Sequence, residues 1–200
     1  MGKFRKWILA GVCLMLCVSL ARLLADKEKL SNGVIRLHVV ANSDSDYDQN
    51  IKLQVRDSVI DYLQSTMDGI SGADQARVCI REKIPQLTAV ANHTLRTLGV
   101  EGEARVQFCR EEFPVRYYES FTLPAGVYDS LRITIGAGAG RNWWCVVFPT
   151  LCFAATAENL EAVAAGAGFS EELTGAITGE YELRFFLLDA LGRLENMFHR

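Results

Sequence analysis

The stretch GVIRLHVVANSDSDYDQN, residues 33–50, changes from strand-like to helix-like sequence. Residues 34–40 are rich in β-branched side chains, and Arg36 and His38 alternate there with apolar neighbours. Residues 42–46 are turn formers, which seldom continue a strand. The stretch therefore predicts a strand that ends in a tight turn.

A helix is expected directly after this turn. Asp46 and Gln49 have the spacing of a capping box, and Ser45 is an alternative cap. The apolar residues that follow repeat at helical spacing, namely Ile51, Val55, Val59, Tyr62 and Leu63. We expect Gly69 and Gly72 to end this helix.

A second helical region is expected over residues 74–98, where apolar residues again recur at intervals of three and four. Pro85 lies inside this region and is expected to kink the helix or divide it in two, because proline removes a backbone donor. Gly99 is a suitable C-terminal stop.

The period then changes to that of strands. Four short strand candidates lie within residues 103–113, 113–123, 130–136 and 142–148, and turn residues separate them. This pattern suggests an antiparallel meander, which the strand at residues 34–40 is expected to join.

The C-terminal part is expected to be helical. Thr156 can cap a short helix that contains Leu160 and Val163, and Ser170 can cap another. Residues 181–198 carry a wide apolar stripe at helical spacing, which we interpret as a helix docked on the sheet. Residues 26–200 are therefore predicted to form one α+β domain with a mainly antiparallel sheet packed by helices.

The first 25 residues differ from the rest. Lys3, Arg5 and Lys6 precede a long apolar run that begins at Trp7. This is the pattern of a signal peptide, and Ser19-Leu20-Ala21 resembles a cleavage site. The apolar stretch is also nearly long enough to span a bilayer as a retained anchor. Both alternatives place residues 26–200 outside the cytoplasm, with membrane contact only through the N-terminal segment.

Export determines how the charges and the cysteines are interpreted. Without the three leader cations the chain keeps 18 basic residues against 24 acidic ones, so it has no electrostatic reason to bind nucleic acid. Four cysteines lie outside the leader, and an exported body permits disulfides between them, namely Cys79, Cys109, Cys145 and Cys152. Whether Cys79 and Cys109 pair stays open at this point.

The polar motifs do not assemble into a known catalytic or metal-binding pattern. The GAGAG run at residues 136–140 precedes a strand and not a helix, so we interpret it as a hairpin loop rather than a phosphate cradle. Asp44, Asp46 and Asp48 alternate like the start of a calcium loop, but the required Gly and Glu are missing further on. We interpret these acids as stabilising a helix N-terminus, with a weak cation site as the alternative. No enzyme activity, metal or cofactor is predicted.

The segment NWWCVVFPTLC, residues 142–152, is the most distinctive part of the chain. Cys145 and Cys152 flank a proline that can reverse the chain, so they are a candidate disulfide. Trp143 and Trp144 point to opposite faces of a strand. Two alternatives follow. Either one tryptophan is exposed and anchors a partner, or both are half-buried core residues.

Three segments together resemble one family. They are IRLHVVANSDSDYDQNIKLQVRD at residues 35–57, LPAGVYDSLRITIGAGAGRNWWCVVFPTLCF at 123–153 and YELRFFLLDAL at 181–191. They are similar to the stage II sporulation protein R family of endospore-forming Firmicutes. One departure is that Ala137 and Ala139 stand in the central loop where charged residues are expected.

The resemblance implies a signalling function. Members of this family are exported from the forespore into the space between its membrane and that of the mother cell. There they activate a membrane-embedded aspartic protease that processes the inactive pro-form of sigma-E. Candidate partner-binding residues are Trp143, Trp144, Asn142, Asp44 and Asp46. Alternatives are an exported cell-wall hydrolase using Asp44, Asp46 or His38, or a membrane-tethered structural scaffold.

Overall fold

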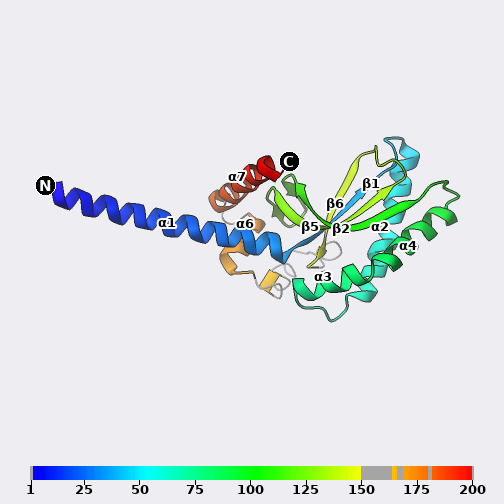
Figure 1. Cartoon of the computed structure of the whole chain (residues 1–200), viewed down its shortest axis with the longest axis horizontal. Helices are drawn as coiled ribbons and strands as arrows, with labels where there is room; N and C mark the ends of the chain where they lie inside the picture. The colour runs from blue at the N-terminus through cyan, green and yellow to red at the C-terminus, as the bar shows by residue number, and fades with distance from the viewer. Residues whose placement is uncertain (1, 150–163, 166–168, 180–181, 200) are drawn as a thin grey trace.

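The computed structural model describes residues 2–149, 164–165, 169–179 and 182–199. A long helix, α1 (Gly2–Gly33), projects from a domain that holds the rest of the described chain (Figure 1). The other helices are α2 (Asp46–Thr66), α3 (Ala73–Glu82), α4 (Ile84–Thr97), α6 (Glu171–Thr178) and α7 (Glu182–His199). The strands are β1 (Ile35–Val40), β2 (Ala104–Phe113), β3 (Arg116–Tyr117), β4 (Thr122–Leu123), β5 (Gly126–Ile135) and β6 (Asn142–Phe148). The predicted α+β class is confirmed.

The main sheet has the strand order β2-β5-β1-β6, and β3 and β4 form a separate small sheet. β1 is parallel to β5 and antiparallel to β6, while β2 is antiparallel to β5. The predicted meander is therefore wrong, because β1 lies between β5 and β6. The loop at residues 136–141 consequently passes over the end of β1 and is not a hairpin. A strand with neighbours on both sides and helices nearby is buried on both faces, and every residue of β1 is buried.

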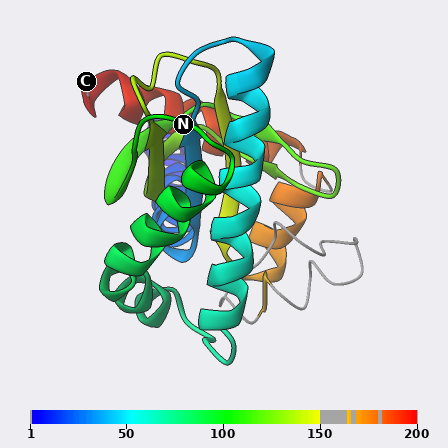
Figure 2. The ribbon, with the colours of Figure 1, turned by 90° about the vertical axis from the view of Figure 1, so that its right-hand side faces the viewer.

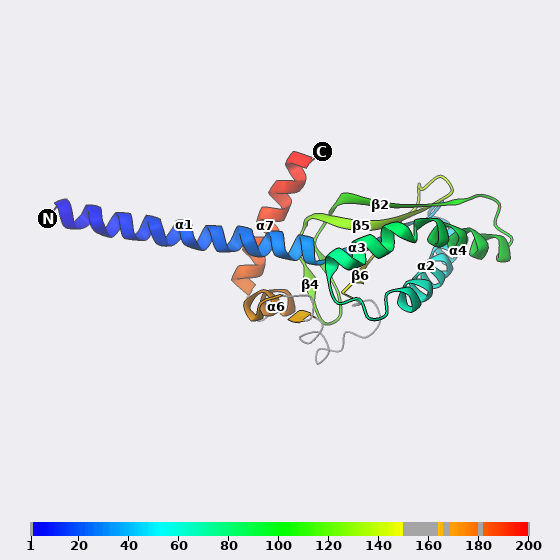
Figure 3. The same ribbon diagram turned by 60° about the horizontal axis from the view of Figure 1, so that its bottom comes forward.

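The first face of β1 packs against the helices that follow it. Ile35, Leu37 and Val39 join a core with the apolar sides of α2, α3 and α4. Figure 3 shows these three helices gathered on one side of the sheet, and α2 and α4 lie side by side in Figure 2. The predicted division of the second helical region is confirmed, because α3 ends before Pro85 and Pro85 stands in the first turn of α4.

The second face of β1 carries the polar side chains, Arg36 and His38, which alternate with the apolar ones. Arg36 is fully buried, and its guanidinium lies 4.2 Å from the Phe113 ring centroid and 5.2 Å from that of Tyr128. Its Nη2 donates to the Tyr118 hydroxyl at 2.7 Å, while Nε and Nη1 have no hydrogen-bond partner among the described residues. Burial lowers the pKa of Arg36. The arginine is held mainly by aromatic faces.

Two predicted helix caps can be compared with the structure. Ser45, and not Asp46, caps α2, because its side chain accepts from the Asp48 amide. Ser170 caps α6, since its hydroxyl accepts from the Leu173 amide. The helix predicted after Thr156, with Leu160 and Val163, lies outside the described residues.

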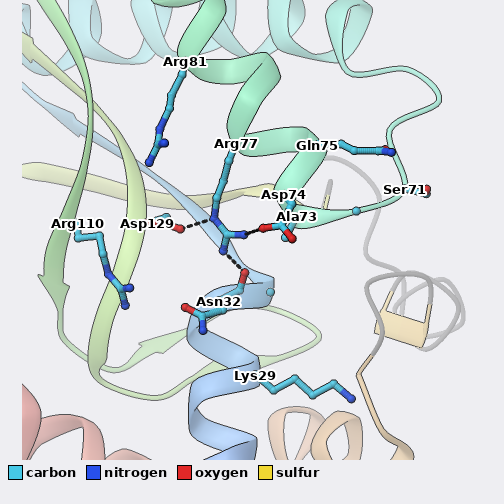
Figure 4. A pocket seen from close by; sticks show the side chains of 12 residues that line it. Lys29, Asn32, Ser71, Ala73, Asp74, Gln75, Arg77, Arg81, Arg110 and Asp129 are labelled. Atoms are coloured by element: carbon cyan, nitrogen blue, oxygen red, sulfur yellow. Dashed lines mark hydrogen bonds and ion pairs between the residues drawn. The ribbon is translucent and has the colours of Figure 1, made fainter.

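α1 is long and apolar enough to cross a membrane by length and composition. Its C-terminal end is fastened to the domain by Arg77 of α3 (Figure 4). Arg77 binds Asp129 of β5 through Nε at 2.6 Å and Asp74 through Nη1 at 2.6 Å, and it also donates to the Asn32 carbonyl of α1. These contacts fix the direction in which α1 leaves the domain.

The last helix docks on the sheet as predicted, since α7 contacts β5, but its apolar stripe is not the docked face. α7 docks through another face, in which Leu188, Asp189 and Gly192 are buried. Asp189 accepts from the Ala125 amide at 2.8 Å, just before β5. Most of the stripe is exposed, and Leu183 retains 72% of its accessible surface, while Ala190 and Leu191 are partly buried. On the docked face Leu188 joins the core around Phe113, and the backbone contact at Gly192 and the polar bond at Asp189 add to this packing.

Candidate interaction site

The end of the sheet opposite α1 is built from loops. Because β1 and β5 are parallel, both finish at this end, and β2 and β6 begin there. The loops at residues 41–45, 98–103 and 136–141 meet at this end, which we call the tip (Figure 2 looks onto it). A cavity of about 230 Å³ lies between them, lined in part by Tyr47, Asp48 and Glu101.

Two of these loops are locked together by hydrogen bonds. The amides of Ala139 and Gly140 donate to the carbonyls of Asn42 and Ala41 at 3.1 and 3.0 Å. The Ala137 amide donates to Asn42 Oδ1 at 3.0 Å. The Arg141 amide donates to Asp44 Oδ1 at 2.7 Å. The loops of the two most distinctive sequence segments therefore form one rigid unit, although 97 residues separate Asp44 from Arg141.

The loop that follows β1 is also braced internally. Asp48 Oδ2 accepts from Asn42 Nδ2 at 3.0 Å and from Ser43 Oγ at 2.5 Å. The hydrogen bond from Ser43, followed by that from Asn42, lowers the pKa of Asp48. Such bonds keep this carboxylate charged and orient the turn before α2.

A buried lysine connects the loop after β1 to the loop at residues 136–141. Lys52 of α2 is only 5% exposed, and its Nζ donates to Gln49 Oε1 at 2.6 Å and to the Arg141 carbonyl at 3.1 Å. Burial, followed by the nearby charge of Arg141, lowers the pKa of Lys52. Gln49 in turn donates to the Ser43 carbonyl at 2.8 Å.

The three alternating acids do not converge on one point. Asp44 is bound to the Arg141 amide, Asp48 to Ser43 and Asn42, and Asp46 stands exposed in the first turn of α2. Among the described residues, no cluster of three acidic, histidine or cysteine side chains is placed to hold a metal ion. The arrangement fits the interpretation of these acids as helix and turn stabilisers.

Behind the tip, His38 of β1 is enclosed by polar and aromatic groups. Its Nδ1 lies 3.1 Å from both carboxylate oxygens of Glu111, and its Nε2 lies 2.9 Å from Asn142 Oδ1. The Trp144 ring stacks on the imidazole with the centroids 3.9 Å apart. His38 is 5% exposed, so a substrate has little access to it. This geometry is that of a structural histidine, and it gives no support to the hydrolase alternative.

The Glu111 carboxylate should make stability depend on acidity. Burial raises the pKa of Glu111, but the hydrogen bond from His38 and the neighbouring charges outweigh burial, so its pKa lies below the ordinary value of 4.5. A lowered folded-state pKa contributes stability that is complete above about pH 4.5 and is lost as the pH falls through the folded-state pKa.

We therefore expect Glu111→Gln to be less stable than the parent chain near pH 7 and to lose less further stability between pH 5 and pH 3. Urea unfolding of the full chain in detergent at several pH values measures this. The exposed Glu103→Gln is the control and should keep the parental pH profile. Parallel profiles for Glu111→Gln and the parent would contradict the expectation.

The tryptophans point to opposite faces, as predicted. Trp143 packs against the core under α2, with the Arg56 guanidinium 4.6 Å from its ring centroid. Trp144 packs against the aromatic layer on the other face, with its ring centroid 4.9 Å from that of Phe113. Both are half-buried, so of the two alternatives the core interpretation describes their packing. Their contact with a partner stays a prediction.

The described residues include three of the four cysteines outside the leader. Cys79 and Cys109 are free thiols, so they do not pair with each other. Cys145 is buried in β6. Cys152 lies outside the described residues, and the Cys145–Cys152 disulfide stays a prediction.

The structure brings three of the five candidate residues to the tip and adds others. Asp44 and Asp46 are exposed there, and Asn142 stands where β6 begins. Tyr47 and Arg141 were not predicted, and both are exposed at the tip. Tyr47 had no clear signal in the sequence, because it stands four positions before Ile51 and so continues the helical spacing of the apolar residues.

The fold and the site define a class of protein, namely a single α+β domain attached to an apolar N-terminal helix, with an interlocked pair of loops at the opposite end. The chain belongs to the stage II sporulation protein R family, whose model matches residues 31–158. The interlocked loops both lie within the matched residues.

A named relative supports the same assignment. The chain is 42% identical over 124 residues to Stage II sporulation protein R of Bacillus subtilis (strain 168). The alignment covers 62% of this chain and 55% of that protein, so the chain matches little more than half of the relative's length. No solved structure matches the chain.

Proposed function

We propose that the protein is an exported signal of sporulation that activates a membrane-embedded aspartic protease. In this proposal the protein acts in the space between the forespore and the mother cell. The activated protease then processes the inactive pro-form of sigma-E in the mother cell. The protein contributes binding and no chemistry of its own.

The observation that carries the proposal is the position of the interlocked loops. They lie at the tip, and α1 leaves from the other end of the domain (Figure 1). β1 leads from the end of α1 to the tip, and its 6 residues are roughly 20 Å long, so the tip stands at the far end of the sheet from the base of α1. A domain held in one membrane by α1 would direct its tip toward a second membrane. If the signal is cleaved, the released domain keeps the same tip.

The chemistry of the tip supports binding to a protein partner. Its exposed side chains include Asp44, Asp46, Glu101 and Glu103 against Arg141, so the surface is acidic. Tyr47 is 60% exposed among these charges. A tyrosine surrounded by polar groups is a common anchor in interfaces, because it buries a large area and loses little conformational entropy. We infer that a basic, partly apolar outer surface of the protease binds here.

A matched pair of tyrosine variants tests this proposal. We expect Tyr47→Ala to reduce processing of pro-sigma-E about tenfold or more, because an interface anchor contributes about 2 kcal/mol or more. Tyr117→Ala removes an equally large side chain that is 77% exposed in β3, away from the tip, and should leave processing unchanged. The measurement is co-expression of the full chain with the protease and its substrate, followed by quantification of the cleaved product.

Three results would count against the proposal. Absence of processing with the parent chain would remove the function itself. Equal processing by the two variants would move the binding surface away from Tyr47. Release of fragments from peptidoglycan by the purified chain would instead favour the hydrolase alternative.

A further inference from the structure

The last helix exposes an apolar face that the described part of the domain does not cover. The six large side chains on this face are 42–86% exposed, and they are Leu183, Phe186, Leu187, Leu194, Met197 and Phe198. At 100° per residue they fall on one side of α7, opposite to the buried Leu188, Asp189 and Gly192. A contiguous apolar surface of this kind generally marks a contact with another apolar body.

α7 crosses α1 instead of running along it. Arg184 of α7 binds Asp26 of α1, and Glu195 Oε2 of α7 lies 2.5 Å from Lys27 Nζ of α1. The two partners on α1 are adjacent in sequence, whereas those on α7 are 11 positions and about 16 Å apart. α7 therefore reaches two adjacent residues of α1 from two distant points along its own length. This is possible only if the two helices cross at a steep angle, as Figures 1 and 3 show.

The crossing point lies where the apolar part of α1 ends. The segment from Trp7 to Ala25 is about 28 Å long as a helix, close to the roughly 30 Å of a bilayer's hydrocarbon core. Its side chains up to Leu20 are exposed in the structure. Asp26 and Lys27 would therefore stand at the boundary between hydrocarbon and head groups, and α7 would lie across α1 at that level.

We propose that α7 is an interfacial helix whose apolar face rests in the surface of the bilayer that α1 spans. The docked face of α7 holds the domain through Asp189 and Gly192, so the opposite face is turned toward the membrane side of α1. The domain then contacts the membrane at two places, in contrast to the expectation of contact through the N-terminal segment alone. The second contact holds the tip away from that membrane.

The proposal names the bilayer, and not a second copy of this chain, as the occupant. Leu24 of α1 is 47% exposed and stands two positions before Asp26, so the exposed apolar surface of α1 reaches to within one turn of the crossing with α7. Among its described residues α7 carries two arginines against three acidic side chains, so its attraction to the surface is apolar and not electrostatic. Zwitterionic lipid should therefore be sufficient.

Quenching of tryptophan emission by brominated lipid tests the proposal. The full chain, with Trp7→Phe to remove the tryptophan of the apolar segment, is reconstituted into phosphatidylcholine vesicles with or without bromine on the acyl chains. One reporter is Phe186→Trp on the exposed face of α7, where the native side chain is 65% exposed. The control is Tyr47→Trp at the tip, where the native side chain is 60% exposed. Met197→Trp is a second reporter in case Phe186→Trp fails to fold.

Trp143 and Trp144 emit in every variant, so the emission of each added tryptophan is taken as the difference from the Trp7→Phe chain. We expect bromine to remove at least about threefold more of this added emission from the α7 reporters than from the tip control, because an interfacial helix lies roughly 5–10 Å into the head-group and acyl boundary. Equal quenching at both positions would overturn the proposal. Emission that is blue-shifted but unquenched, and that changes with the protein-to-lipid ratio, would assign this face to a second copy and would also overturn it.

Discussion

Replacing Gly140 with alanine is expected to separate the two interlocked loops and to abolish most of the signalling activity. A Cβ at this position would overlap the backbone carbonyl of Ser43 and lie 2.9 Å from the Ala41 side chain. The Ser43 carbonyl accepts from Gln49 Nε2, and the neighbouring Asn42 carbonyl accepts from the Ala139 amide, so this backbone cannot turn aside as a flexible side chain does. The loops must instead move apart, and the bonds from Ala139 and Gly140 to the loop after β1 are then lost.

The expected cost to stability is moderate compared with the effect at the tip. Overpacking of this kind costs about 1–3 kcal/mol. A loss of about 2 kcal/mol lowers the Tm of a domain of this size by roughly 4–8 °C. The cores under α2 and around Phe113 do not include Gly140, so the variant should still fold. Processing of pro-sigma-E should fall far more than the folded fraction does, because the shape of the tip changes.

Gly72→Ala is the matched control for this prediction. Its Cβ would meet no atom within 4 Å, and its backbone conformation suits any residue. We expect it to cost under about 1 kcal/mol and to leave processing unchanged. Thermal unfolding of the full chains in detergent and quantification of cleaved sigma-E measure the two effects. Parental processing by a folded Gly140→Ala chain would show that the locked loops are not the signal.

Local features of the fold can be predicted from the sequence because they depend on neighbouring residues. Ser45 and Ser170 cap helices through amides three positions on, and Pro85 divides two helices through its own missing donor. The alternation of Arg36 and His38 likewise separates the two faces of β1. Each of these effects acts within a few residues.

Pairing between distant segments is less accessible, because period alone does not say which strands are neighbours. β1 is a central strand, buried between β5 and β6. Its sequence does not predict this position, because one Arg and one His stand among its six residues. Burial of Arg36 depends on the rings of Phe113 and Tyr128, which are distant in sequence. The enclosure of His38 by Glu111, Asn142 and Trp144 joins three strands in the same way.

At the tip, too, local features can be predicted from the sequence, whereas contacts between distant segments cannot. The two loop segments are distinctive as sequences, but the hydrogen bonds that join them depend on β1 and β5 being parallel. A meander would have placed the loop at 136–141 beside its own strands instead of over the end of β1. The apolar stripe of α7 was recognised correctly as a stripe, but its period does not distinguish a face that meets a sheet from one that meets lipid.

Replacing Gly192 with alanine is expected to detach α7 from the domain. In an ordinary helix this change stabilises by about 1 kcal/mol, because glycine is a poor helix former. Here a Cβ would overlap the Ala125 carbonyl group and lie 3.1 Å from the Gly126 amide nitrogen. The obstacle is backbone at the start of β5, so the helix must move away from the sheet.

Movement of α7 also breaks the polar bonds that hold it. Asp189 accepts from the buried Ala125 amide, and Glu195 accepts from the Val127 amide at 3.2 Å and from Lys27 of α1. The lost bonds and the overlap together should cost about 2–5 kcal/mol. Leu194→Ala changes a 51% exposed side chain two positions away and should stay within about 0.5 kcal/mol of the parent.

Urea unfolding of the full chains in detergent distinguishes these expectations. If Gly192→Ala is as stable as the parent, the close approach of α7 to the strand is not required for docking, and the orientation of its apolar face loses its structural basis. If it is destabilised while Leu194→Ala is not, the docked face of α7 is fixed by backbone contact. The apolar face is then free to meet the membrane.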